Sequence, residues 1–97
     1  MSYPVILPNA HLYEAIADER ARQERLRIAG KFPFTCGDRT RSSLDKLPVL
    51  VEEVGEVARA VLQEHGTAVQ DDARELREEL IQVAAVCMAW LESLEES

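Results

Sequence analysis

Two short groups of acidic and amide side chains carry the strongest chemical pattern in the chain. They are Glu52, Glu53 and Glu56 on one predicted helix, and Glu79 and Gln82 on another. Like charges three or four residues apart destabilise an isolated helix, so a positive partner is expected. One candidate is Arg59, one turn beyond Glu56, in an ordinary surface ion pair. The other is a divalent cation, for which carboxylates from two packed helices form a cage of hard oxygen ligands.

The position of Glu79 on its helix favours an interaction inside the protein. At 100° per residue, Glu79 falls on the same side as Val83, Val86 and Trp90, which is the side expected to be buried. An unpaired buried carboxylate costs several kcal/mol or takes up a proton. Glu79 therefore needs a partner, either a bound cation or a lysine or arginine from elsewhere in the chain.

Glycine and proline divide the chain into three predicted helices at about residues 10–29, 45–65 and 71–94. Asn9 is a predicted N-cap, Gly30 a predicted C-terminal stop, and Pro48 lies in the first turn of the second helix. A turn near residues 66–70 precedes the third helix, for which Asp71 or Asp72 is the predicted N-cap. Residues 30–43 show no helical or strand period, which predicts a long loop.

Apolar periodicity predicts how these helices pack. On the second helix, the predicted core face lies opposite Glu52, Glu53 and Glu56 and consists of Leu50, Val54, Val57, Ala58 and Val61. On the third, residues 80–91 are apolar except for Gln82, so burial is expected on all faces. Three short helices cannot enclose such a segment. The predicted fold is therefore an all-α, three-helix protomer that forms an oligomeric helical bundle, as a homodimer or homotetramer.

Composition and charge exclude several classes of protein. Ninety-seven residues with 46% hydrophobic content predict one domain, residues 1–97. The net charge of −7, with net +2 in residues 1–43 and −9 in residues 44–97, argues against a nucleic-acid polymer as partner. The longest apolar stretch is too short to cross a membrane. Two widely spaced cysteines and the lack of a signal peptide predict a cytoplasmic protein with reduced thiols.

The paired acidic motifs resemble those of a known family. A Glu-Glu-x-x-Glu helix, followed by a Glu-x-x-Asp-like element on a strongly apolar helix, is similar to the MazG-like members of the all-α nucleoside triphosphate pyrophosphohydrolases. The resemblance covers a motif-bearing core of about residues 44–94. It implies Mg²⁺-dependent (or Mn²⁺-dependent) hydrolysis of (deoxy)nucleoside triphosphates to monophosphate and pyrophosphate. The implied metal ligands are Glu52, Glu53, Glu56 and Glu79, with Gln82 where the family usually has aspartate.

The chemistry of such a reaction assigns further residues. A polyanionic substrate repels carboxylates, so a metal must stand between them. Glu53 and Glu56 are the candidates for the general base that activates the attacking water. The cations expected to grip the phosphates are Lys31, Arg39, Arg41 and Lys46. Phe32 and Phe34 lie among them and either face a bound ring or pack on the core.

Two other functions remain open at this point. In the first, the chain is a helical oligomerisation or regulatory module of the same fold, because the amide of Gln82 contributes no charge to a metal site. In the second, the acidic face docks a basic protein or imitates nucleic acid.

Overall fold

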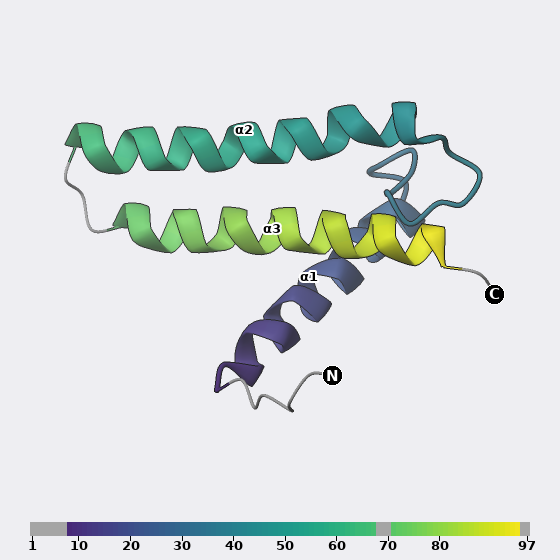
Figure 1. Ribbon diagram of the computed structural model, residues 1–97, viewed down its shortest axis with the longest axis horizontal. Helices are drawn as coiled ribbons and strands as arrows, with labels where there is room; N and C mark the ends of the chain where they lie inside the picture. The colour runs from purple at the N-terminus through teal and green to yellow at the C-terminus, as the bar shows by residue number, and fades with distance from the viewer. Residues whose placement is uncertain (1–7, 68–70, 96–97) are drawn as a thin grey trace, which may run out of the picture.

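The computed structural model describes residues 8–67 and 71–95, and side chains there except for those of residues 64–73. Over this range the chain forms α1 (Ala10–Ile28), α2 (Ser43–Thr67) and α3 (Asp71–Leu94), with no strand. Figure 1 shows α2 and α3 side by side as an antiparallel hairpin, while α1 crosses α3 obliquely. Both α1 and α2 pack on α3. The predicted all-α class is confirmed, and no described helix meets the length and hydropathy needed to cross a bilayer.

The ends of α1 follow from its flanking residues. Asn9 occupies the N-cap position, but its side chain makes no capping hydrogen bond; its carbonyl instead accepts from the Leu12 amide at 2.9 Å. At the other end Gly30 has φ +81°, a conformation that glycine adopts without a Cβ clash. The Gly30 amide donates to Arg27 and the Lys31 amide to Leu26, at 2.9 and 2.8 Å. This is a Schellman motif, and it stops the helix as predicted.

The start of α2 lies earlier than the pattern predicted. Ser42 and Asp45 form a reciprocal capping box: the Asp45 amide donates to Ser42 Oγ at 3.2 Å and the Ser42 amide to Asp45 Oδ2 at 3.4 Å. The helix therefore begins at Ser43, two residues before the predicted range. It also continues past the predicted end at His65, to Thr67. The predicted turn falls partly outside the described residues, as do the side chains of Asp71 and Asp72.

Small side chains form the core of the single chain. The buried apolar residues are Cys36, Ala60, Ala85, Val86 and Ala89, and none of the large side chains described is fully buried. Val49, Leu50 and Trp90 pack around Cys36, Val86 and Ala89. The Cα radius of gyration is 15.5 Å, whereas about 12.5 Å is expected for a compact domain of this length. One copy thus encloses little apolar volume.

The predicted core faces are only partly buried. Val54 is 50% exposed and Ala58 is also exposed, so placing them in the core of one chain was wrong. The reason is that α2 has two apolar faces, and only the face of Val49, Leu50 and Ala60 meets α3. Likewise Leu80 and Leu91 on α3 are 51% and 61% exposed. Burial of α3 on all sides would need a second chain.

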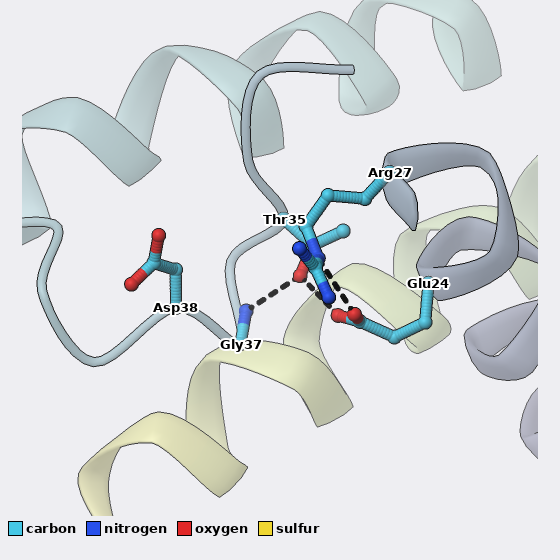
Figure 2. A pocket seen from close by; sticks show the side chains of 5 residues that line it. All are labelled: Glu24, Arg27, Thr35, Gly37 and Asp38. Atoms are coloured by element: carbon cyan, nitrogen blue, oxygen red, sulfur yellow. Dashed lines mark hydrogen bonds and ion pairs between the residues drawn. The ribbon is translucent and has the colours of Figure 1, made fainter. Parts of the chain in front are cut away.

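A charged clamp fastens the loop between α1 and α2 to α1. Glu24 accepts hydrogen bonds from Thr35 Oγ1 at 2.5 Å, Arg20 Nη1 at 2.8 Å and Arg27 Nε at 2.9 Å. Figure 2 shows the Glu24 carboxylate in contact with Thr35 and Arg27, and the Gly37 amide donating to Thr35 Oγ1. These residues and Asp38 line a hollow of about 300 Å³. The polar groups that line this hollow are hydrogen-bonded to one another, and these bonds hold the loop against α1.

The clamp shifts the titration of its central group. Burial alone opposes ionisation of Glu24, but the hydrogen bonds from Thr35, Arg27 and Arg20 outweigh it and lower the pKa of Glu24 to about 2. A carboxyl group whose pKa is lower in the folded state stabilises the fold above its unfolded-state pKa. That contribution is lost as the pH falls from about 4.5 towards 2.

We expect Glu24→Gln to lower the free energy of unfolding at pH 7 by about 1–3 kcal/mol, because the charge-assisted hydrogen bonds are replaced by weaker ones. Urea denaturation at pH 7 and pH 3 measures the effect, which should be smaller at pH 3. Glu14→Gln, an exposed site on the same helix, is the control. Equal stability of Glu24→Gln and the wild type at pH 7 would contradict the clamp.

Candidate functional site

Glu53 of α2 and Glu79 of α3 approach each other across the helical hairpin, and the Gln82 side chain lies between them. One end of the Gln82 amide stands 3.1 Å from Glu53 Oε2 and 3.3 Å from Glu79 Oε2, and with nitrogen at that end it donates to both carboxylates. All three side chains are half-buried. The partner that Glu79 required is therefore an amide from its own helix.

The remaining two motif glutamates point elsewhere. Glu52 is exposed, and Glu56 accepts a hydrogen bond from Arg59 Nη2 at 2.5 Å, the ion pair expected from their spacing. Across the residues that the structure describes, no group of three or more histidine, cysteine, aspartate or glutamate side chains is placed to hold a metal ion. The structure thus brings Glu53 and Glu79 together at Gln82, while Glu52 and Glu56 act on this pair through their charges.

Like charges and burial act together on the acid pair. Burial raises the pKa of Glu53, and the neighbouring charge of Glu79 raises it further, followed by Glu52, Glu56 and Glu19. Burial also raises the pKa of Glu79, with Glu56 as the next cause and Arg59 acting in the opposite direction. Both carboxylates therefore hold a proton more readily than an exposed glutamate does.

The donor set at this position suits a hard cation. If the Gln82 amide turns so that its oxygen faces the acids, three oxygen donors meet, and Mg²⁺ and Mn²⁺ prefer such ligands. A groove of about 450 Å³ between α1 and α3 includes Gln82 in its wall. Among the described side chains, only two carboxylates, those of Glu53 and Glu79, lie at this position. For Glu56 to become a third carboxylate ligand, its ion pair with Arg59 would have to break.

An apolar cavity of about 180 Å³ opens beside Glu53. Its lining residues are Gln23, Phe32, Pro33, Phe34, Thr35, Cys36, Val49, Glu53 and Val86. The loop supplies the aromatic and proline side of the cavity, and α2 and α3 supply the aliphatic side. The arrangement places an apolar cavity beside a carboxylate.

The loop cations make contacts away from the acid pair. Arg41 Cζ lies 4.5 Å from the centre of the Phe34 ring, a cation–π contact. Arg39 Nη2 donates to the Glu92 carbonyl at 3.5 Å, and Lys31 is exposed. Lys46 is only 3% exposed, with Nζ donating to Ser93 Oγ at 2.7 Å. Of the four, Arg41 is tied by its Phe34 contact to the wall of the cavity.

Side chains of α1 reach this region, which the sequence did not indicate. Gln23 is buried and donates from Nε2 to Glu19 Oε2 at 3.2 Å. Arg22 donates to both oxygens of Glu19 at 2.8 Å. These hydrogen bonds raise the pKa of Arg22, and Glu53 adds to the rise. The buried face of such a polar helix cannot be recognised from the spacing of apolar residues, so the burial of Gln23 could be identified only in the structure.

Comparison with known proteins adds no relative. No family model matches the chain, and neither curated proteins nor solved structures include a match. The resemblance to MazG-like enzymes therefore stays a prediction based on the motif residues.

We expect Glu53→Gln to raise the melting temperature at pH 7 by about 2–5 °C when divalent cations are absent. The folded-state pKa of Glu53 is raised, so its contribution to stability falls as the pH rises above its unfolded-state value of about 4.5. Removing the charge relieves the repulsion from Glu79.

Thermal unfolding with a chelator, at pH 7 and pH 4, tests this expectation. The gain should shrink at pH 4, where the wild-type carboxyl is largely protonated. Glu52→Gln is the matched control: Glu52 is exposed and acts on Glu53 less than Glu79 does, so its replacement should raise the melting temperature less than Glu53→Gln. A lower melting temperature for Glu53→Gln at pH 7 would contradict the assignment of Glu53 to a repulsive pair.

Proposed function

We propose that the protein hydrolyses (deoxy)nucleoside triphosphates to nucleoside monophosphate and pyrophosphate with the help of Mg²⁺ or Mn²⁺. The observation that carries the proposal is the meeting of Glu53 and Glu79 at the Gln82 amide beside a phenylalanine-lined cavity. A nucleotide consists of a flat base and a polyphosphate. The cavity suits the first part, and acids that can hold a cation suit the second.

The base is placed against the loop side of the cavity. A volume of about 180 Å³ accommodates a nucleobase, and phenylalanine rings stack on bases of any sequence. Arg41, which lies on Phe34, and the exposed Lys31 are then the loop cations best placed to meet the phosphates. Arg39 contributes if it leaves the Glu92 carbonyl, whereas Lys46 is buried against Ser93.

The roles of the acids follow from their surroundings. Glu53, Glu79 and Gln82 would hold the cation, joined by Glu56 and the exposed Glu52 on rearrangement. When bound, the cation neutralises the phosphate charge. Glu53 is the better candidate for accepting a proton from the attacking water, because it borders the cavity; it would do so on the carboxylate oxygen that the cation leaves free. Glu56 is engaged by Arg59.

A second function is favoured by one observation. The Gln82 nitrogen satisfies both carboxylates without any cation, as expected for a helical oligomerisation or regulatory module in which catalysis has been lost. Such a module would be indifferent to metal. The enzyme and the module are therefore distinguished by their response to Mg²⁺ or Mn²⁺.

We expect the wild-type protein to release pyrophosphate and monophosphate from at least one nucleoside triphosphate in the presence of Mg²⁺ or Mn²⁺. Glu53→Gln should lower kcat by at least about 10²-fold, since a general base contributes that much. Gln82→Asp should tighten metal binding by adding a negative charge. Product identification by chromatography and metal titration by thermal shift measure these effects.

The control for this experiment is Glu95→Gln, at an exposed position after α3, which should keep full activity and metal response. Release of orthophosphate would contradict cleavage at the α-phosphorus. A melting temperature that does not respond to saturating metal would reject the enzyme and favour the regulatory module.

We further propose that a second copy of the chain covers the exposed faces of α2 and α3. The apolar side chains on α2 that repeat at intervals of three and four residues are Leu44, Leu47, Val51, Val54, Ala58 and Leu62. On α3 they are Leu80, Ala84, Cys87, Leu91 and Leu94. This is the spacing of helices that pack along a common seam.

The two rows suit an identical hairpin better than another partner. Projected at 100° per residue, they fall on the same side of the antiparallel pair. Two such hairpins placed face to face make a four-helix bundle and supply the large apolar core that one chain lacks. A hollow of about 300 Å³, lined by Cys87, Trp90, Leu91 and Leu94, offers space for side chains of the second copy.

We expect Leu91→Glu to shift the protein from dimer or tetramer towards monomer, because a charge would be buried in the seam. Light scattering after gel filtration measures the mass. Ile28→Glu, on α1 and 73% exposed in the wild type, introduces the same charge outside the seam and should leave the mass unchanged. A wild-type protein that is monomeric at about 100 μM, or an unchanged mass for Leu91→Glu, would reject the interface.

A further inference from the structure

A buried polar residue lines the apolar cavity beside Glu53. Gln23 is 9% exposed and shares the cavity wall with Phe32, Phe34 and Val86. A polar group is costly to bury among such side chains unless it forms hydrogen bonds. Ligand cavities commonly combine apolar walls with a few fixed polar groups that set the orientation of the ligand.

The amide is held by a chain of hydrogen bonds along one face of α1. Its Nε2 donates to Glu19 Oε2 at 3.2 Å. Both oxygens of Glu19 accept from Arg22, at 2.8 Å each, and the Glu19 side chain is only 12% exposed. Arg22 thus fixes Glu19, and Glu19 fixes the orientation of the Gln23 amide. This orientation is set before any ligand arrives.

We propose that Gln23 binds the polar edge of the nucleobase and so selects nucleotides as the ligands of this cavity. An amide has two N–H donors and one oxygen acceptor. With one N–H given to Glu19, the oxygen and the second N–H remain for a ligand. Every nucleobase carries a donor next to an acceptor on an edge, as when glutamine pairs with the N6 and N7 positions of adenine.

The surroundings of Gln23 complete this assignment. Aromatic rings stack on the faces of a base, but they form no hydrogen bonds with the polar groups along its edge. These groups lose their bound water when the base enters the cavity. Leaving that edge unpaired is costly, so an all-apolar cavity would reject a base. This inference deepens the proposed function, because it names the group that recognises the base, and it requires neither metal nor hydrolysis.

The test is direct binding of uncharged nucleosides to the full-length protein without metal. Adenosine, guanosine, cytidine and uridine are titrated against ¹⁵N-labelled protein, and amide shifts around the cavity report binding. At least one nucleoside should bind in the millimolar range or tighter. Gln23→Met, which keeps the length and burial of the side chain but removes the amide, should weaken binding by about tenfold or more.

A second variant and a control separate recognition from folding. Gln23→Asn keeps an amide but is shorter by one carbon, and it should also weaken nucleoside binding while the melting temperature stays close to that of the wild type. Gln63→Met changes an exposed glutamine on the distant half of α2 and should bind as the wild type does.

Each result decides the assignment. Nucleoside binding that is lost in both Gln23 variants supports it, even if the wild type hydrolyses no triphosphate, in which case only the proposed function fails. Equal binding by the wild type and Gln23→Met would overturn it. Absence of nucleoside binding by the wild type at about 10 mM would also overturn it, even if triphosphates are hydrolysed.

Discussion

The repulsion between Glu53 and Glu79 is the constraint around which the hairpin is arranged. Two half-buried carboxylates face each other where α2 and α3 pack, and an amide from α3 lies between them. Such a pair opposes folding of the single chain, because burial and like charge both raise its pKa values. Groups that cost stability in this way are characteristic of functional sites. The proposed metal site depends on this position, and the cavity lined by Gln23 borders it at Glu53.

Much of the fold could be predicted from local sequence patterns. Glycine, proline and capping residues predicted three helices, and the structure confirms them, because helix ends depend on groups close in the sequence. The start of α2 was missed because the capping box of Ser42 and Asp45 was not identified in the sequence. The burial of Val54 was also wrong, since an apolar period does not tell which of two faces meets a partner helix.

The candidate site was predictable only in part. The spacing of the acids placed Glu53 and Glu79 on packed helices, and the structure brings them together at Gln82. The ion pair of Arg59 with Glu56 was also expected from their spacing, but the sequence did not reveal that Lys46 is buried against Ser93. Glu19 and Gln23 come from a helix that crosses α3, and such long-range packing depends on tertiary contacts. Their hydrogen bonds emerge only in three dimensions.

Among the helices described, α1 packs against α3 and not against α2. The cavity wall combines Gln23 of α1 with Glu53 of α2, although the backbones of these two helices do not come close together in the part of the chain described. A molecule that fills the cavity would therefore contact two helices that, among the described residues, are otherwise connected only through α3 and the loop between them. Occupancy would slow amide-proton exchange in α1 and the loop while leaving the outer turns of the hairpin nearly unchanged.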